Sequence, residues 1–563
     1  MSIKLELDDS RRLTGKNLIW DYPGAIIDVF ISGIEPHQVV DCFKDSLAFI
    51  LERIGWTQSH FHYRLFEGGA SFVISAPMDA LYAATEVNEA VWLQVCEHFL
   101  QQVPDETLEQ ACERIIAAIE EESNPLLMNF LKQSSEHQIP FLVDDDELTL
   151  GFGKHSQTWP VRSLPDINKI DWQQFKGLPI AMVTGTNGKS TTVRLAAEMV
   201  MQDHLICGVT STDFIRVGSQ ILDEGDYSGP LGARTLLKHP DTEVALLEVA
   251  RGGLLRRGLA VDKIDAALIT NIASDHLGQY GIYDLEGLTQ TKGIVAKGLD
   301  NGPLILNADD EQLVHFAKFC DKQIIWFSID SQHLLIKQQI EQGKICAFLE
   351  QGKLIYHDGI AKEILAVDDI PMTLSGAAHH NVKNALGAIC LARALNVSWN
   401  AIRQALKTFK SDASDNPGRG NQFHIKDATL LVDFAHNAHS MAAMAETAAN
   451  LSADKKILLM SSAGDRSDED IIAMTKAALK MNPNCIYFAE VEKYLRGRAL
   501  GEVTELMKKT AQKCGYTSEQ IIQVSSPILG TQQIVSKLQG CELVLIMALT
   551  QREKIFQYLQ NSL

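Results

Sequence analysis

The segment that most constrains this chain is a glycine-rich run between an apolar stretch and a helical pattern. Residues 178–185 have the sequence LPIAMVTG, which predicts a short buried strand, and residues 185–192 have the sequence GTNGKSTT. A helix is expected from Ser190 to about Gln202. Glycines let the backbone curl so that successive N–H groups face an anion, and the N-terminus of a helix adds its dipole. The run therefore predicts a phosphate-binding loop on an α/β sheet.

Two side chains of this loop have a chemical role in the prediction. Lys189 is expected to reach the β- and γ-phosphates of a nucleotide, and the Ser190 hydroxyl to bind Mg²⁺. Val183 stands where the common pattern has its first glycine, so the spacing departs from that pattern. An ordinary glycine-rich turn is the alternative, but the flanking strand and helix favour the phosphate loop. The other nucleotide-binding residues expected in the loop are Gly185, Thr186, Asn187, Gly188 and Thr191.

Apolar strands alternate with helical segments before and after about residue 415. The expected strands are 206–210, 243–250, 264–272 and 303–307, followed by 429–435, 456–463, 485–491 and 542–549. Nearly continuous apolar strands separated by helices indicate parallel sheets covered on both faces. We therefore expect an α/β central domain at 165–414 and a smaller, Rossmann-like α/β domain at 415–563. The turn-forming sequence Asn416-Pro417-Gly418 places the boundary.

The first 164 residues lack this alternation. Helical patterns at 39–55 and 87–103 flank residues 61–78, in which Glu67-Gly68-Gly69 indicates a β-hairpin. We expect an α+β domain at 1–164.

Charge and composition exclude several classes of function. The 563 residues carry a formal net charge of −20, which makes the chain a poor generic binder of duplex nucleic acid or of an anionic membrane. No stretch approaches the roughly 20 apolar residues of a membrane helix. The first residues, MSIKLELDDSRR, lack the apolar core of a signal peptide. We expect a cytoplasmic protein that binds neither nucleic acid nor membrane.

Metal-binding side chains follow two strands of the predicted central sheet. Glu248 ends one strand, at the edge where ligands bind to open α/β sheets, and a carboxylate beside a phosphate loop is a natural Mg²⁺ ligand. His276 follows another strand and is a candidate for a second metal site. A solvated strand-end acid and a structural histidine are the respective alternatives. Lys292 lies in a helical pattern and, taken alone, is typical of a surface lysine.

Eight segments, taken together and in order, resemble the Mur ligase superfamily. The resemblance covers about residues 165–563, and within the superfamily it is strongest to the cyanophycin synthetases. Residues 11–20 and 72–90 also resemble the opening domain of those synthetases. Those synthetases place an ATP-grasp domain between the two parts, whereas here only about a dozen residues separate them. The segments are GTNGKSTT (185–192), LLEVARGG (246–253), TNIASDHLG (270–278), LNADD (306–310), HHNVKNALGA (379–388), NPGRGN (416–421), DFAHNAHS (433–440) and SAGDR (462–466).

The resemblance implies an ATP-dependent, ADP-forming ligase that joins an amine to a carboxylate through an acyl phosphate, with ATP and Mg²⁺ as cofactors. It implies catalytic roles for Lys189, His276 and Lys292. Ser190 and Glu248 would carry one Mg²⁺, and His276 a second, together with Lys292 as a carbamate. It also implies that ATP contacts Asn307, Asn381, Asn384, Arg419 and Asp433. Turn or helix-capping roles are the alternatives for the three asparagines. The alternatives for Arg419 and Asp433 are a buried, paired arginine and a strand-end aspartate.

Substrates are less constrained than the nucleotide. One amide bond per cycle, on an amino acid or short peptide, is expected without an ATP-grasp centre. Asp465 and Glu490 are candidates for an acidic pocket. Arg496 and Arg498 are candidates for gripping a carboxylate, with solvent-exposed arginines on a helix as the alternative.

Two functions of different classes follow from these observations. The first is the ligase, and the second is a nucleotide-binding partner of a complete synthetase that has lost catalysis. Retention of Lys189, Ser190, Glu248 and His276 favours the ligase. A homo-oligomer, most simply a dimer, is expected, because closed symmetric assemblies are common among enzymes.

Overall fold

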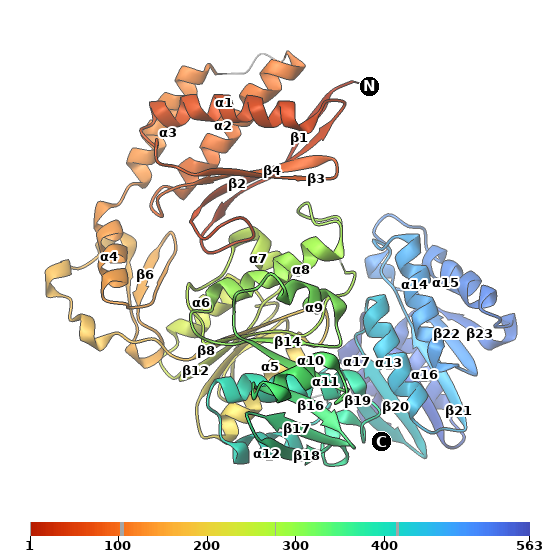
Figure 1. The fold of residues 1–563 in the computed structure, drawn as a ribbon. Coiled ribbons are helices and arrows are strands. Elements are labelled where there is room, and N and C mark those ends of the chain that lie inside the picture. The colour runs from red at the N-terminus through yellow and green to blue at the C-terminus, as the bar shows by residue number, and fades with distance from the viewer. Residues whose placement is uncertain (1, 102–105, 276, 413–415, 563) are drawn as a thin grey trace.

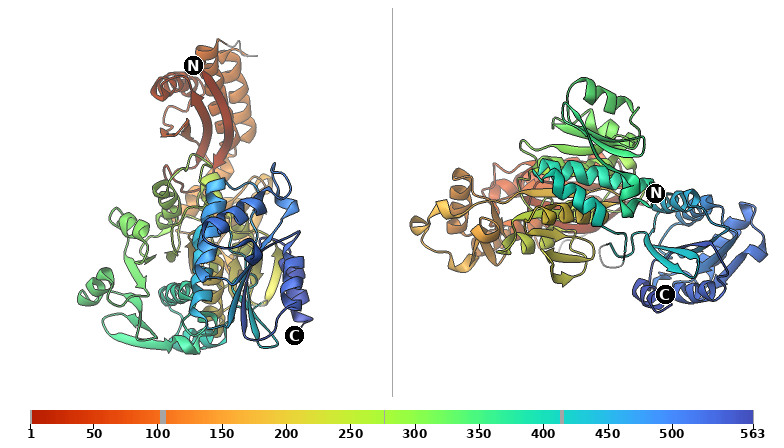
Figure 2. Two further views of the ribbon diagram at one scale, coloured as in Figure 1. Left: turned by 90° about the vertical axis from the view of Figure 1, so that its right-hand side faces the viewer. Right: turned by 90° about the horizontal axis from the view of Figure 1, so that it is seen from below.

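The computed structural model describes residues 2–101, 106–275, 277–412 and 416–562, which form four sheets (Figure 1). The parts follow one another along the chain, with the N-terminal sheet and its helices standing above the large central sheet and the C-terminal domain beside it (Figures 1 and 2). Among the described residues, no helix combines the length and apolar character that a membrane crossing requires.

The N-terminal part is an antiparallel sheet covered on one face by helices. Its strand order is β1-β2-β4-β3, and β3 pairs with β4 around the predicted hairpin, which is confirmed. Phe43 of α1 stacks on Phe72 of β4 at 4.1 Å between ring centres, in the core between sheet and helices. The elements are β1 (Lys4–Leu13), β2 (Gly24–Ser32), α1 (Pro36–Arg53), β3 (Phe61–Phe66), β4 (Gly69–Ser75), α2 (Leu81–Leu100) and α3 (Leu108–Glu122).

A second, small unit separates this sheet from the phosphate loop. Helix α4 packs on a three-stranded antiparallel sheet through its own apolar cluster, which includes Phe130, Leu148 and Phe175. Residues 1–164 contribute to two apolar cores, and the second of these continues to Phe175. The elements are α4 (Pro125–Glu136), β5 (Phe141–Val143), β6 (Glu147–Leu150) and β7 (Gln157–Pro160).

The central sheet has eleven strands in the order β11-β10-β9-β12-β8-β13-β14-β15-β16-β17-β18. Its middle, from β9 to β16, is parallel, and antiparallel strands extend both ends. The strands are β8 (Ile180–Thr184), β9 (Cys207–Thr210), β10 (Phe214–Val217), β11 (Gln220–Glu224), β12 (Val244–Glu248), β13 (Ala266–Ile269), β14 (Leu304–Asn307), β15 (Ile324–Ser328), β16 (Cys346–Glu350), β17 (Lys353–His357) and β18 (Ala361–Ala366).

Helices cover both faces of this sheet, as the continuous apolar strands predicted. Along β8, Ala181 and Val183 pack against α5, α11 and α12, whereas Ile180 and Met182 pack on the side of α6 to α10. Successive strand residues face opposite sides, so a strand buried on both faces is apolar throughout. The helices are α5 (Lys189–Gln202), α6 (Pro230–Lys238), α7 (Arg251–Arg257), α8 (Leu285–Gly293), α9 (Glu311–Ala317), α10 (Leu334–Glu341), α11 (His379–Ala394) and α12 (Trp399–Thr408).

The C-terminal domain is a smaller α/β layer structure with strand order β19-β20-β24-β21-β22-β23, parallel except for β19. Helices α13 to α15 cover one face and α16 and α17 the other. The elements are β19 (Asn421–Ile425), β20 (Ala428–Asp433), α13 (Ala438–Asn450), β21 (Lys455–Met460), α14 (Asp468–Ala478), β22 (Cys485–Ala489), α15 (Glu502–Lys513), β23 (Ile521–Val524), α16 (Pro527–Ser536), β24 (Glu542–Met547) and α17 (Arg552–Gln560).

Candidate nucleotide-binding site

The phosphate loop follows β8 and leads into α5, at the carboxyl end of the central strands. Gly185 has φ +144° and Gly188 has φ +86°, conformations that side chains disfavour. A Cβ on Gly185 would lie 1.9 Å from Thr270 Oγ1, and one on Gly188 would lie 2.3 Å from Asn384 Oδ1. The two glycines therefore satisfy both a backbone conformation and a close approach of neighbouring side chains.

The two residues that follow strand β13 hold the loop in place. The Thr186 backbone N–H donates to the Asn271 carbonyl at 2.9 Å, and the Asn187 N–H donates to Asn271 Oδ1 at 3.0 Å. Thr270 Oγ1 donates to the Asn187 carbonyl at 2.6 Å. These bonds fix the loop before any ligand binds.

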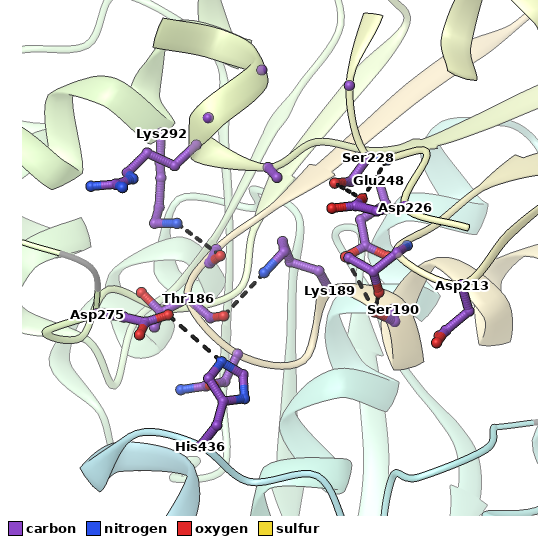
Figure 3. Close-up of a pocket in the computed structure, with 18 of the residues that line it drawn as sticks. Thr186, Lys189, Ser190, Asp213, Asp226, Ser228, Glu248, Asp275, Lys292 and His436 are labelled. Atoms are coloured by element: carbon purple, nitrogen blue, oxygen red, sulfur yellow. Dashed lines mark hydrogen bonds and ion pairs between the residues drawn. The ribbon is translucent and has the colours of Figure 1, made fainter. Parts of the chain in front are cut away.

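Lys189 points back across the loop (Figure 3). Its Nζ donates to the Thr186 carbonyl at 3.1 Å. Burial lowers the pKa of Lys189, and the nearby carboxylates Glu248 and Asp275 oppose that shift. The lysine is the first residue of α5 and only partly exposed. A cation held there, at a helix N-terminus, suits a bound phosphate.

Oxygen ligands gather beside Lys189. Ser190 Oγ donates to Glu248 Oε1 at 3.2 Å, and the Thr212 backbone N–H donates to Glu248 Oε2 at 3.3 Å. Asp226 lies next to this pair and accepts from Ser228 Oγ at 2.6 Å (Figure 3). Mg²⁺ prefers one or two carboxylates together with a hydroxyl and substrate phosphates. The donor set around Ser190 and Glu248 fits Mg²⁺; Asp226 was not among the sequence predictions.

The second predicted metal site is described only in part. His276 lies outside the described residues. Its neighbour Asp275 forms an ion pair with Arg466 at 3.2 Å and lies 3.9 Å from His436 Nε2, and both partners belong to the C-terminal domain (Figure 3). No cluster of three or more metal-ligating His, Cys, Asp or Glu side chains occurs among the described residues.

Lys292 is buried, not a surface lysine. It is 4% exposed, and its Nζ donates to the Gly185 carbonyl at 2.8 Å (Figure 3). Burial and then the charges of Lys189 and Arg251 hold the pKa of Lys292 well below its usual value, although Asp275 opposes them. An amine with a lowered pKa is more often unprotonated, which is the form that reacts with CO₂.

The three asparagines implied to bind ATP are buried next to the loop. Asn307 Nδ2 donates to the Thr270 carbonyl at 3.1 Å. Asn384 Nδ2 donates to Asn381 Oδ1 at 3.1 Å, and Asn381 Nδ2 donates to the Met372 carbonyl at 2.8 Å. All three line the cavity of the phosphate loop, where the amides of Asn307 and Asn381 bond backbone carbonyls and that of Asn384 bonds the side chain of Asn381.

The C-terminal domain reaches the same loop. Arg419 lies over the ring of Phe434, with its guanidinium carbon 5.7 Å from the ring centre. Burial raises the pKa of Asp433 to about 6, and Arg419 opposes that shift. Two contacts were not predicted: Asn187 and Asn437 exchange side-chain amide bonds of 3.2 and 3.1 Å.

The polar residues considered for substrate binding divide into two groups. Arg496 is paired with Asp465 at 3.1 Å, and Arg498 with Asp468 at 2.8 Å. These two arginines therefore have carboxylate partners within the C-terminal domain. Glu490 instead is buried, accepts from the Gly501 N–H at 2.7 Å and lines the large cavity.

One cavity of about 2640 Å³ connects the phosphate loop with the C-terminal and N-terminal domains. It is lined by the phosphate loop, by the strand ends carrying Glu248 and Asp275, and by Arg419 and Asp433 of the C-terminal domain. It continues to the N-terminal domain, where Tyr82 lines it. The fold and site define a phosphate-loop α/β protein with a cavity shared by all of its domains.

Comparisons with known proteins agree with that class. Residues 183–392 match the model of the Mur ligase middle domain. Over 339 residues, 60% of this chain, the sequence is 36% identical to a cyanophycin synthetase of a Nostoc species, and over 44% it is 30% identical to the UDP-N-acetylmuramoylalanine–D-glutamate ligase of Acidobacterium capsulatum. These alignments cover 37% and 48% of the relatives. Residues 183–392 are thus similar to the middle domain of the Mur ligases, and the chain spans little more than a third of the length of the cyanophycin synthetases that it matches.

Solved structures show the same fold. FolC of E. coli, in complex with DHPP and ADP, superposes with a TM-score of 0.52 at 19% identity, over 68% of this chain and 89% of FolC. A bifunctional folylpolyglutamate synthase/dihydrofolate synthase, solved with Mn, AMPPNP and L-glutamate bound, has a TM-score of 0.51 at 21% identity over the same shares. The predicted multidomain α/β fold is confirmed.

Proposed function

We propose that this chain is an ATP-dependent, ADP-forming ligase that joins an amine to a carboxylate through an acyl phosphate. The observation that carries this proposal is the position of Ser190 Oγ, in the phosphate loop, 3.2 Å from Glu248 Oε1 within one cavity. The chain that holds this pair is similar to Mur ligases. The proposal includes the domain ranges 1–164, 165–414 and 415–563 and an assembly of two or more copies.

In this proposal the loop binds the ATP phosphates. Backbone N–H groups of residues 185–191 and the Lys189 ammonium neutralise the β- and γ-phosphates. Ser190 and Glu248 would hold Mg²⁺, which supplies charge neutralisation on the phosphates when bound. Asn307, Asn381 and Asn384 frame the nucleotide from the central domain, and Arg419 and Asp433 from the C-terminal domain.

The bond changes follow from the chemistry of carboxylates. A substrate carboxylate oxygen attacks the γ-phosphorus, the bond from that phosphorus to the β–γ bridging oxygen breaks, and ADP leaves. The amine nitrogen then attacks the acyl carbon, forming the C–N bond and expelling phosphate, and the amine loses a proton. The chain's residues position these groups and stabilise charge instead of forming covalent intermediates.

His276 and Lys292 are proposed to complete a second cation site. The buried position of Lys292 and its lowered pKa support a carbamate there, since carbamate formation needs a neutral amine. Asp275 is close enough to Lys292 for its charge to raise the pKa of the Lys292 amine. The carbamate converts a cation into an anionic ligand.

Isotope transfer tests this function directly. Pairs of amino acids and small acids are screened for ADP and phosphate release, and the active acid is then labelled with ¹⁸O in its carboxylate. Transfer of one ¹⁸O to phosphate, lost in Lys189→Ala, is expected for an acyl phosphate. ADP release without transfer would contradict that intermediate, and ATP binding with no turnover across the screen would favour the catalytically inactive partner.

A further inference from the structure

Three arginines from distant parts of the chain meet at the end of the cavity next to the N-terminal domain. Arg12 lies on β1, Arg234 on α6 and Arg257 at the end of α7, and all three line the cavity that begins at the phosphate loop. Arg12 and Arg257 are joined by a bond from Arg257 Nη1 to the Arg12 carbonyl of 3.1 Å. We call these three residues the arginine cluster.

Among the described residues, one carboxylate forms hydrogen bonds to the cluster, and its bonds go to Arg12. Asp145 accepts two bonds from Arg12, at 2.5 and 3.2 Å, and a third from the Tyr82 hydroxyl at 2.8 Å. The Arg12 guanidinium also lies 3.7 Å from the centre of the Tyr82 ring. This network holds Arg12 in place, and it leaves Asp145 paired with Arg12.

Arg234 is different, because within the described part of the chain it forms no hydrogen bond and no ion pair. Its Nε is buried without a partner. Asp144, the next carboxylate, lies 3.8 Å from Lys238 Nζ, which also binds Glu147 at 2.7 Å. A guanidinium with a buried donor and no partner is costly unless something completes it.

Burial and neighbouring charges act on the pKa values of the cluster. Burial lowers the pKa of Arg234, and Asp144 and Asp145 only partly oppose it. Burial lowers the pKa of Arg257 as well, followed by the charge of Arg12. Asp145 is bonded to Arg12 and Asp144 lies 3.8 Å from Lys238 Nζ, so neither carboxylate pairs with the buried Nε of Arg234.

The distance to the phosphate loop limits the ligand. Helix α7 starts three residues after Glu248 and ends at Arg257, so its seven residues rise by about 10 Å between the strand end and the backbone of Arg257. An extended peptide covers about 3.3 Å per residue, so roughly three residues bridge that distance. A free amino acid is too short to reach both.

We propose that the arginine cluster is a subsite for a second anionic group, a carboxylate or a phosphate, on an extended acceptor whose reacting carboxylate lies at the phosphate loop. The placement of the reacting carboxylate at the phosphate loop rests on the proposed function, whereas the anion subsite at the arginine cluster does not. Planar guanidinium groups bind both kinds of anion through paired N–H donors. The acceptor is then a short acidic oligomer, and a free amino acid is a poor substitute.

Calorimetric titration in saturating AMPPNP and Mg²⁺, which occupies the phosphate loop, tests the subsite without requiring turnover. The probes are L-aspartate, a tetra-aspartate peptide, and a peptide of equal length with phosphoserine at one end and aspartate at the other. Wild-type protein is expected to bind at least one peptide at least tenfold more tightly than L-aspartate. Arg234→Gln should weaken that peptide about 10- to 100-fold, and Arg234→Lys less, because lysine keeps the charge and loses the fork.

The matched control is Arg53→Gln, an exposed arginine at the end of α1, which should leave binding unchanged. Preference for the tetra-aspartate or for the phosphoserine peptide identifies the anion. Equal binding of all probes by wild-type protein, or unchanged peptide binding by a folded Arg234→Gln variant, overturns the subsite. If the wild-type protein turns over substrate and only the Arg234→Gln variant loses peptide binding, both proposals are supported. If peptide binding depends on Arg234 but no substrate is turned over, the ligase proposal is refuted and the subsite is retained.

Discussion

The phosphate loop and the arginine cluster are the two anion-binding regions of one cavity, and they are built in opposite ways. The loop uses eight consecutive residues, two of them glycines, between a strand and a helix. The cluster uses side chains at positions 12, 234 and 257, from two domains. Backbone N–H groups provide a site that local sequence specifies, whereas long side chains provide one that exists only where separate domains pack together.

The strongest test of the loop is Lys189→Ala. We expect ATP turnover to fall roughly 100- to 1000-fold or more, because a preorganised charge on the transferred phosphate is lost. The matched control is Lys407→Ala, an exposed lysine on α12. Thermal unfolding should show little change, since among the described residues the Lys189 ammonium donates to the Thr186 carbonyl of its own loop. Retained turnover in a folded Lys189→Ala variant would contradict the assignment of the loop.

The second test removes charge beside the loop without removing volume. Glu248→Gln should raise the Mg²⁺ concentration needed for half-maximal turnover roughly 10- to 100-fold, because a carboxylate ligand becomes a neutral amide. Turnover is measured as a function of Mg²⁺ at saturating ATP. Glu243→Gln, at the residue that precedes the opposite end of β12, serves as the control. An unchanged Mg²⁺ requirement would exclude Glu248 as a ligand.

The third test asks whether the N-terminal domain supports the loop region or only the arginine cluster. Arg64 of β3 donates to the carbonyls of Gly281 and Tyr280 at 2.7 and 2.8 Å, in the segment that follows Asp275. Arg64→Ala should lower kcat about tenfold with a smaller change in the KM for ATP, because small displacements of catalytic groups are costly.

Arg64→Lys should restore part of that loss, since it keeps a donor, and Arg53→Ala should be neutral. If Arg64→Ala folds and keeps full kcat, the N-terminal domain does not position the catalytic edge, and its role narrows to the arginine cluster.

The smallest expected effect concerns pH and the C-terminal side of the cavity. Burial raises the pKa of Asp433 to about 6, above its value of about 4 in an unfolded chain. Between about pH 4 and 6 the folded protein therefore binds the extra proton, and the free energy of unfolding falls as pH rises through that window. Asp433→Asn should remove this component, measured by urea unfolding at about pH 4.5 and about pH 7. The exposed Asp427→Asn is the control, and an identical pH dependence in Asp433→Asn would contradict the assignment.

The sequence alone determined the phosphate loop, the helix after it and the strands that carry the site. Helix α5 begins at Lys189, one residue from its predicted start, and β12 ends on Glu248 as expected. These features depend on periodicity, glycine conformation and apolar runs within a few residues. The hairpin between β3 and β4 was predictable for the same reason.

Only the tertiary structure decided which side chains meet. It buried Lys292 against Gly185, paired Asn187 with Asn437 across 250 residues, and brought Arg12 to Arg257. It also extended the central sheet beyond β14 at one edge and by β10 and β11 at the other, and it built the first 164 residues around two cores, none of which the sequence indicated. A lysine in a helical pattern is the same letter whether it faces solvent or a phosphate loop. What it contacts is set by the packing of elements far away in the chain, and local sequence does not encode that packing.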